Sequence, residues 1–263
     1  MSYYITRNNR ITNYWYNETG GGFLLDQYGE DIVGAYSVRR LSSSYTGPLI
    51  QIQRSSDNST TDINYDSQGN LDQFAITIFT GTGNTAYVTK WYDQSGNGLD
   101  MVSTGNPYTI ATSVDPISNP TVFTKNSRPT IGGFSTAFPG SSQLVNTSFP
   151  LVEQPFTFFE IFADDQTTGI GFSKRIFEGK KSITKPANQV VSQFFSNPNK
   201  SELFTSASGS NGFLDTLLTP TDTNSHLYTK MVDGSSTIMR ADSQVQATSG
   251  SVISASAFGG TSL

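Results

Sequence analysis

The chain has 263 residues, enough for one large β-domain with a sizeable core or for two small domains. Hydrophobic residues make up 35% and charged residues 14%, a composition typical of short strands joined by many polar turns. The net charge of −5 offers no basic surface for phosphates, which argues against a nucleic-acid partner.

The sequence holds no cysteine, which excludes disulfides, thiolate metal sites and a cysteine nucleophile. No apolar run approaches the roughly 18 residues that span a bilayer, so we expect no membrane insertion. The first ten residues lack the order of basic, apolar and small residues found in a secretory signal. A protein that works outside the cell would then leave it by assembly or lysis.

The N-terminal part is predicted to contain an arm and one short helix. Residues 1–22 are rich in Tyr, Asn and Arg and end in three glycines, which is typical of an arm that docks on a neighbouring subunit. A helix is predicted to begin at Asp31, with Asp31 as N-cap and Ile32, Ala35 and Tyr36 on successive turns.

Strand patterns follow in chain order. Residues 49–54 alternate between apolar and polar, and residues 61–63 resume the pattern after a turn. Residues 71–79 fit a helix or a strand, and both stay open. Residues 103–130 carry four prolines, which favours a surface loop. The strongest strand pattern is 156–163, and shorter ones follow at 175–178, 190–195, 202–205 and 226–232. The sum predicts an all-β, antiparallel two-sheet sandwich of jelly-roll type with one short N-terminal helix.

Residues 87–98 form an alternating strand that runs into a polar, glycine-closed turn. Rings such as Trp91 and Tyr92 can stack on sugar C–H groups, while Asp93, Gln94 and Asn97 can hydrogen-bond to hydroxyls. These five residues are the candidate glycan-binding site. The same stretch also fits a buried corner that satisfies strand ends, which we favour.

Four ordered blocks resemble a known family. They resemble the start of concanavalin A-like, laminin-G-type sandwich domains, which are related to the catalytic domain of arabinofuranosidase B glycosidases and recur in phage structural proteins. The blocks are residues 34–41, 45–48, 54–58 with 62–63, and 91–98, and residues 126–129 with 138–140 resemble the next block. The resemblance implies one concanavalin A-like sandwich over residues 23–263.

The chain departs from these enzymes in two ways. They pair a vicinal disulfide with their sugar site, and this chain has no cysteine. Their catalytic carboxylates also lie in cysteine-containing segments that cannot be matched here, so the resemblance implies fold more than activity. The chain ends at Leu263 where the family runs on into closing strands. Either the sandwich is shortened, or a partner subunit supplies the missing edge.

Residues for catalysis can be named only weakly. Glycoside hydrolysis needs two carboxyl groups, about 5 Å apart for retention or roughly 6.5 to 9.5 Å apart for inversion. Glu160 in the strongest strand and Asp165 at its exit are the candidates. The favoured alternative is a solvent-facing Glu160 and a turn residue Asp165 without a catalytic role. The only histidine, His226, reads as a packed or surface residue in a strand rather than as a base.

Charged residues near the N-terminal blocks allow two interpretations. Asp57, Asp62 and Asp93 are conceivable Ca²⁺ ligands, and Ca²⁺ is the one cofactor left open. The favoured alternative is a set of structural ion pairs and Asx-turns. That set comprises Arg39, Arg40, Arg54, Asp57 and Asp62.

These observations lead to a non-enzymatic structural protein of a bacteriophage virion, assembled in the host cytoplasm, as the main expectation. As a head or tail decoration or fibre component it would form a homo-oligomer, contact other virion proteins through its arm, and adhere weakly and multivalently to cell-surface glycan. An arabinofuranosidase-type glycoside hydrolase is the first alternative. A purely architectural decoration protein without a ligand is the second.

Overall fold

The computed structural model describes two compact units of the chain. The described residues are 2–7, 22–28, 31–103, 108–109, 124–125, 128–129, 144–150, 152–153, 155–162, 173–180, 189–196, 199–207, 210–216, 226–233, 236–242, 244–245, 248–251, 257–258 and 261–262. Unit 1 comprises Met1–Ser2 and Ile11–Val145, and unit 2 comprises Tyr3–Arg10 and Asn146–Leu263.

Strands dominate both units. Most of them belong to two large sheets, and the strand pairs within each unit run antiparallel. The predicted all-β, antiparallel two-sheet class is therefore confirmed. Within the described ranges, no helix is long and apolar enough to span a membrane.

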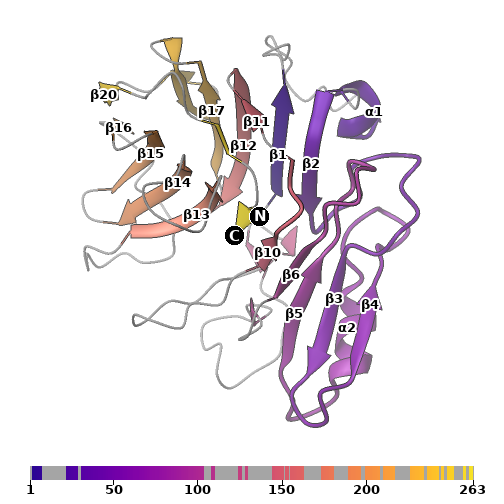
Figure 1. Cartoon of the computed structure of the whole chain (residues 1–263). Helices are drawn as coiled ribbons and strands as arrows, with labels where there is room; N and C mark the ends of the chain where they lie inside the picture. The colour runs from indigo at the N-terminus through magenta and orange to yellow at the C-terminus, as the bar shows by residue number, and fades with distance from the viewer. Residues whose placement is uncertain are drawn as a thin grey trace. The chain divides into compact units, whose positions relative to one another are not determined.

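The sheet of unit 1 has β3 (Ile50–Arg54) between β4 (Thr60–Ile63) and β5 (Ala86–Trp91) (Figure 1). The register places Ile50 opposite Trp91 and Ile52 opposite Val88, and all four side chains are buried. The residues between them are partly exposed, as alternation in a sheet with one buried face requires. Further strands of unit 1 are β6 (Met101–Ser103), β7 (Tyr108–Thr109), β8 (Thr124–Lys125) and β9 (Arg128–Pro129), and most of β10 (Leu144–Asn146) also belongs to it.

The predicted helix at Asp31 is wrong. Residues Ile32–Ser37 form strand β2, and all six are buried. A surface helix leaves one face in water, whereas a segment that is apolar on both faces is typical of a buried strand. The short N-terminal helix lies earlier, as α1 (Leu24–Tyr28).

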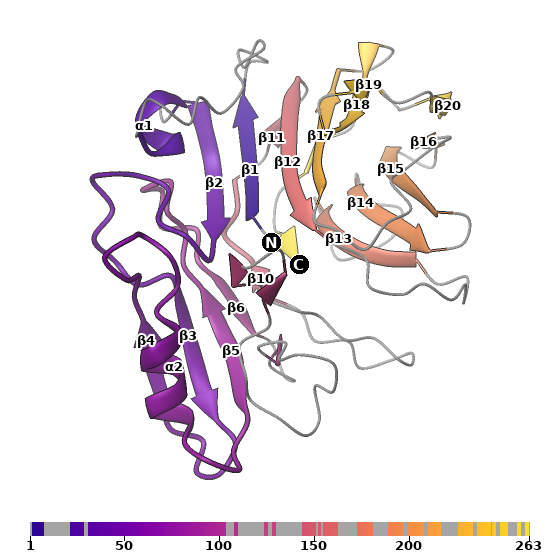
Figure 2. The same cartoon turned by 180° about the vertical axis from the view of Figure 1, so that it is seen from behind.

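The ambiguous segment 71–79 contains helix α2 (Gln73–Thr80). Asp72 is its N-cap, and the side chain accepts a hydrogen bond from Ala75 N at 2.9 Å. The helix packs against β3 and β4, and both views show it over one face of this sheet (Figures 1 and 2). Ile76 points into the core, whereas Phe74 and Ile78 remain exposed.

Unit 2 contains a meander, in which β13, β14, β15 and β16 pair in chain order and β20 follows β16. A second group pairs β12 with β17, β17 with β18 and β18 with β19. The strands predicted at 156–163, 175–178, 190–195, 202–205 and 226–232 are all present. Their bounds and those of the other strands are β1 (Ser2–Arg7), β11 (Val152–Glu153), β12 (Phe156–Phe162), β13 (Ser173–Lys180), β14 (Gln189–Ser196), β15 (Asn199–Ala207), β16 (Ser210–Thr216), β17 (His226–Val232), β18 (Ile238–Ala241), β19 (Gln244–Val245), β20 (Thr248–Ser251), β21 (Ala257–Phe258) and β22 (Thr261–Ser262).

Two predicted segments fall mainly on residues that are not described. Of the predicted arm 1–22, the structure describes β1 and residue 22, and residues 1 and 8–21 lie outside the described residues. Of the predicted loop 103–130, only residue 103 and the short strands β7, β8 and β9 are described. Near the C-terminus, β20, β21 and β22 pair with β16, β11 and β13.

The α2 cap provides a test of the fold. Replacing Asp72 with Ala removes the acceptor for Ala75 N, and we expect the free energy of unfolding to fall by about 1 kcal/mol. Asp72→Asn keeps an acceptor and should cost much less. Urea denaturation of both variants checks this, and equal midpoints for the two would contradict the role of the cap.

Candidate functional site

The carboxylate of Asp93 is buried and fully engaged. Its Oδ1 accepts hydrogen bonds from Ala35 N and Ser95 N, both at 2.9 Å. Its Oδ2 accepts from Ser95 Oγ at 2.7 Å and from Leu99 N at 3.1 Å. A carboxylate has about four lone-pair sites, so this one serves the backbone of β2 and of its own turn.

Gln94 joins the same turn to the segment after β2. Its Oε1 accepts from Leu41 N at 2.9 Å, and its Nε2 donates to Ser37 O at 3.0 Å and Arg39 O at 2.9 Å. The side chain is buried. An amide that bridges three backbone groups replaces the pairing that a neighbouring strand would give.

Asn97 completes this arrangement at the start of β2. Its Nδ2 donates to Ile32 O at 2.9 Å and Val33 O at 3.0 Å. We call the contacts made by the side chains of Asp93, Gln94 and Asn97 the turn network. The network fastens residues 92–99 to residues 32–41.

The predicted glycan residues are therefore split between core and surface. Trp91 is buried, with its ring centroid 6.0 Å from that of Tyr36. Asp93 and Gln94 are buried in the turn network. Only Tyr92 and Asn97 of the five reach the surface. The buried-corner interpretation describes this geometry, because the Trp91 ring has no face open to a sugar.

Tyr92 lies in a polar cluster on the outward face of the unit 1 sheet. Its hydroxyl donates to Asp62 Oδ1 at 2.7 Å, and Gln51 Nε2 donates to the same oxygen at 3.1 Å. Lys90 Nζ lies 4.9 Å from the Tyr92 ring centroid and 3.8 Å from Asp100 Oδ2. Burial, and then the hydrogen bond to Asp62, raise the pKa of Tyr92 well above its ordinary value.

One of the predicted structural ion pairs is shown directly. Arg54 Nη2 lies 2.6 Å from Asp57 Oδ2, and the hydrogen bond from Arg54 holds the pKa of Asp57 well below its usual range. Arg40 instead lies over the rings of Phe23 and Tyr65, at 4.9 and 4.8 Å. The N–H of Arg39 donates to Ser37 Oγ at 3.1 Å, and Asp62 belongs to the Tyr92 cluster.

The structure does not gather the three conceivable calcium ligands. Asp57 is paired with Arg54, Asp62 with Tyr92 and Gln51, and Asp93 with backbone N–H groups. Among the side chains that the structure describes, no three acidic or histidine residues form a group that could hold a metal ion.

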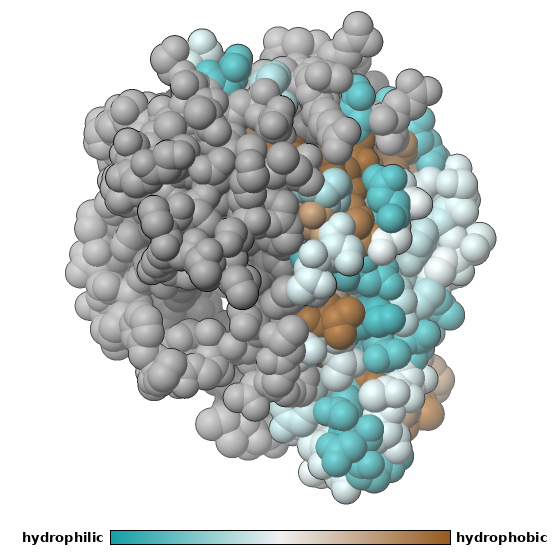
Figure 3. Space-filling model, in the orientation of Figure 1, coloured by the Kyte–Doolittle hydropathy of each residue, from teal (hydrophilic) through white to brown (hydrophobic). Residues whose placement is uncertain are grey.

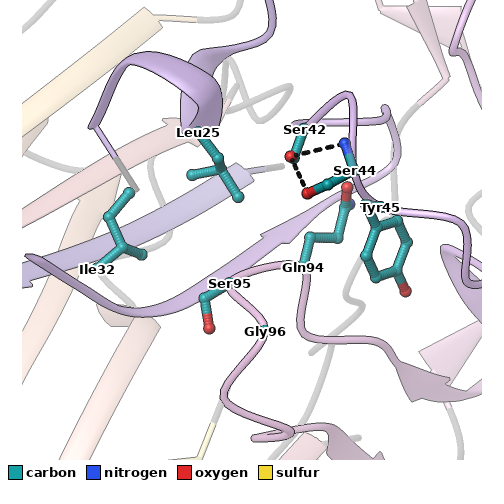
Figure 4. A pocket seen from close by; sticks show the side chains of 8 residues that line it. All are labelled: Leu25, Ile32, Ser42, Ser44, Tyr45, Gln94, Ser95 and Gly96. Carbon is teal, nitrogen blue, oxygen red and sulfur yellow. Dashed lines mark hydrogen bonds between the residues drawn. The ribbon is translucent and has the colours of Figure 1, made fainter. Parts of the chain in front are cut away.

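A pocket of about 240 Å³ lies beside the turn network in unit 1 (Figure 4). Leu25 and Ile32 form an apolar wall, and hydroxyl and amide groups form the rest. Behind it, Ser42 Oγ donates to Asp26 Oδ1 at 2.7 Å, and such hydrogen bonds lower the pKa of Asp26. The lining residues are Leu25, Ile32, Ser42, Ser44, Tyr45, Gln94, Ser95 and Gly96.

The sequence did not indicate this pocket. Its residues come from α1, from β2, from the serine-rich turn 42–45 and from the turn after β5. Each segment alone has the composition of an ordinary turn or strand end. The pocket forms because residues 94–97 pair with residues 32–41 far along the chain, and this pairing is visible only in the fold.

Glu160, a candidate acid, is buried on β12 with no exposed surface. Its Oε2 lies 3.2 Å from Nζ of Lys230 on β17, which is also buried. The expectation that Glu160 faces solvent is wrong, because a lysine from the neighbouring strand compensates its charge inside the unit. Asp165 lies outside the described residues.

The only histidine closes a hairpin. His226 Nδ1 lies 2.5 Å from Asp242 Oδ2, and Asp242 Oδ1 accepts from Leu227 N at 3.0 Å. Asp242 has a φ of +46°, a left-handed conformation that Asp tolerates better than most residues. The pair thus joins the start of β17 to the end of β18.

Comparison with known proteins gives a sequence relation over the N-terminal part. The family model for the catalytic region of alpha-L-arabinofuranosidase B matches residues 25–131. Alpha-L-arabinofuranosidase B of Emericella nidulans is 42% identical over 74 residues, which are 28% of this chain and 14% of that protein. An arabinofuranosidase/B-xylosidase of Trichoderma koningii is 45% identical over 71 residues, 27% of this chain and 14% of that protein.

Solved structures show a likeness of fold. A GH54 arabinofuranosidase soaked with a cyclic sulfate inhibitor has a TM-score of 0.52 and 14% identity, over 91% of this chain and 56% of that one. An arabinofuranosidase complexed with arabinofuranosyl-alpha-1,2-xylobiose has a TM-score of 0.52, 15% identity and the same coverage. The chain is related to the arabinofuranosidase B catalytic domain, and it matches 14% of the length of these curated relatives.

The expectation of a bacteriophage structural protein is wrong. The matching family model and the fungal relatives are arabinofuranosidases, which overturns the virion function, the virion partners and the virion location together. The expectation failed because it relied on sequence blocks that build the fold. In the structure, the turn network of these blocks binds the backbone of β2 and of the segment after it, a role that does not distinguish a virion protein from an enzyme.

The turn network predicts a large cost for Gln94→Ala. The change leaves Leu41 N, Ser37 O and Arg39 O without this partner, and we expect a loss of about 3 kcal/mol because each buried unsatisfied group costs about 1 to 3 kcal/mol. Gln51→Ala, which removes a partly exposed amide, is the matched control and should cost less than about 1 kcal/mol. Chemical denaturation measures both, and similar losses would contradict the network's role.

The buried pair in unit 2 predicts a non-additive response. Lys230→Met leaves the Glu160 carboxylate buried without its cation, which should cost about 3 to 5 kcal/mol. The double variant Lys230→Met/Glu160→Leu should recover most of that loss, because well-packed apolar residues often replace a buried ion pair without cost. Unfolding in urea tests this, and a double variant less stable than Lys230→Met would be the opposite result.

Proposed function

We propose that the protein is an arabinofuranosidase-type glycoside hydrolase that releases terminal α-L-arabinofuranosyl residues from a glycan. The observation that supports this most is the match of residues 25–131 to the arabinofuranosidase B catalytic model. The fold likeness to two solved arabinofuranosidases supports the scaffold over 91% of the chain.

Such an enzyme needs two carboxyl groups on either side of one glycosidic bond. Glu202 on β15 and Asp215 on β16 occupy directly opposite positions in the antiparallel register. We propose these two residues, from their register positions, as the acid pair of a retaining glycosidase.

The neighbouring register positions support a sugar site at this place. Gln193 of β14 stands opposite Glu202, and the row two residues further on places Phe204 opposite Phe213. Residues two apart in a strand lie on the same face. The register therefore places one amide residue and two aromatic residues near the proposed acids along these strands.

In the proposed reaction, one carboxyl group of the pair donates a proton to the leaving-group oxygen. The other carboxylate attacks the anomeric carbon, so that the glycosidic bond breaks as a glycosyl-enzyme ester forms. Water then attacks that carbon and gives its proton back to the first group, which releases arabinose with its configuration retained.

Hydrolysis of an aryl α-L-arabinofuranoside tests the proposal. We expect turnover by the full chain and a fall of about 10²- to 10⁴-fold in Glu202→Gln and in Asp215→Asn, the range that a positioned acid or base contributes. Asp62→Asn changes an exposed acid of unit 1 and should keep the rate. NMR of the first product should show the retained anomer.

The outcomes separate the activity from the residues. A folded wild-type protein that shows no turnover would contradict the proposed function. If both acid variants still hydrolyse the substrate at the wild-type rate, the proposed activity holds and the proposed acid pair is wrong. An inverted product would contradict the proposed two-step mechanism.

A further inference from the structure

We infer that the pocket of unit 1 is a second sugar site, which binds one neutral pentose unit apart from the acid pair of unit 2. The choice of a pentose rests on the proposed function. The choice of a neutral, hydroxyl-rich ring rests on the pocket itself.

The lining of the pocket selects for an uncharged polyol. No residue that lines it carries a charge, and its polar residues are three serines, one tyrosine and one glutamine. Hydroxyl groups both donate and accept, as the hydroxyls of a sugar do. Leu25 and Ile32 supply the apolar surface on which the C–H side of a ring packs.

The polar groups are held in place before any ligand arrives. Ser42 Oγ donates to Asp26 and lies 2.9 Å from Ser44 Oγ, and Ser95 Oγ donates to Asp93 Oδ2. The Ser42 Oγ atom also accepts a hydrogen bond from Ser44 N at 3.2 Å, and Ser95 Oγ accepts one from Asn97 N at 3.3 Å. Fixed side chains lose little conformational entropy when a ligand binds.

The size of the pocket limits the ligand to one ring. Its volume is about 240 Å³, below the roughly 300 to 1,000 Å³ of pockets for drug-sized ligands. Gly96 forms part of its edge with a φ of +89°, and no heavy atom lies within 4 Å of the position that a Cβ would take there. The open space beside Gly96 would let the ring remain attached to a longer glycan.

The role that follows is retention of an arabinosylated chain. A branch residue bound here would keep the glycan on the enzyme. A linked second contact raises the effective concentration of the substrate without a change in the chemical step. The pocket should therefore matter for a branched polymer and not for a small aryl glycoside.

Ser44→Met is the variant that tests this site. Ser44 is exposed and lines the pocket, so a longer apolar side chain occupies the space and removes one hydroxyl. Thr46→Met is the matched control, because Thr46 is exposed in the same turn and does not line the pocket. Circular dichroism should show both variants folded.

The measurement is a titration of the full chain with L-arabinose, followed by NMR shifts of the 42–45 and 94–96 amides. We expect saturable shifts with a dissociation constant of about 1 mM in wild type and Thr46→Met, as for a ligand with few contacts, and a loss of at least tenfold in affinity in Ser44→Met. Galacturonic acid should give no shifts, because the pocket offers no cation.

Kinetics complete the test. Ser44→Met should hydrolyse the aryl arabinofuranoside like wild type but arabinosylated polymer more slowly. Absent shifts in wild type, or equal affinity in Ser44→Met, would overturn the sugar site whatever the hydrolysis assay shows. Saturable binding that Asp215→Asn retains would support the site even where no turnover is found, which separates its failure from that of the proposed function.

Discussion

Three side chains of one turn satisfy a long stretch of buried backbone. Asp93, Gln94 and Asn97 bind N–H and C=O groups between residues 32 and 41, where β2 is buried along its whole length. Backbone polar groups cut off from water must find partners, because an orphaned group costs as much as a lost hydrogen bond. The position of β2 in unit 1 thus depends on carboxylate and carboxamide groups of a turn about sixty residues away.

The pocket depends on the same constraint. Gln94 holds Leu41 in place, so the turn 42–45 begins from a fixed point. Ser95 lines the pocket and is bound through its hydroxyl to Asp93. The part of the chain that matches the arabinofuranosidase model contains the whole network, whereas the proposed acid pair lies in unit 2, outside that match. The turn network that stabilises unit 1 and the proposed catalytic acids therefore lie in different segments of the chain.

Some features could be predicted from the sequence because they depend on local pattern. Alternation identified β3, β5 and β12, and the polar turn after Trp91 was favoured as a corner, which is how Asp93 and Asn97 act.

Other features depend on partners far along the chain. The helix expected at Asp31 followed an apolar spacing that a doubly buried strand satisfies equally well. The Glu160–Lys230 pair could not be foreseen, because alternation alone does not say which face of β12 and β17 is covered. The low charge and missing cysteines suggested a particle component, and they are equally compatible with a relative of a hydrolase.

The reach of the turn network also sets an order of events during synthesis. The side chains that bind the backbone of Ala35, Leu41 and Ile32 lie 58, 53 and 65 residues further along the chain and are therefore synthesised later. A nascent chain that has emerged only to β4 holds β2 with none of the contacts from the turn, and contacts of such sequence separation form slowly. We expect the apolar β2 to lack these partners until residue 97 has been made, a period in which it is open to chaperones or to aggregation.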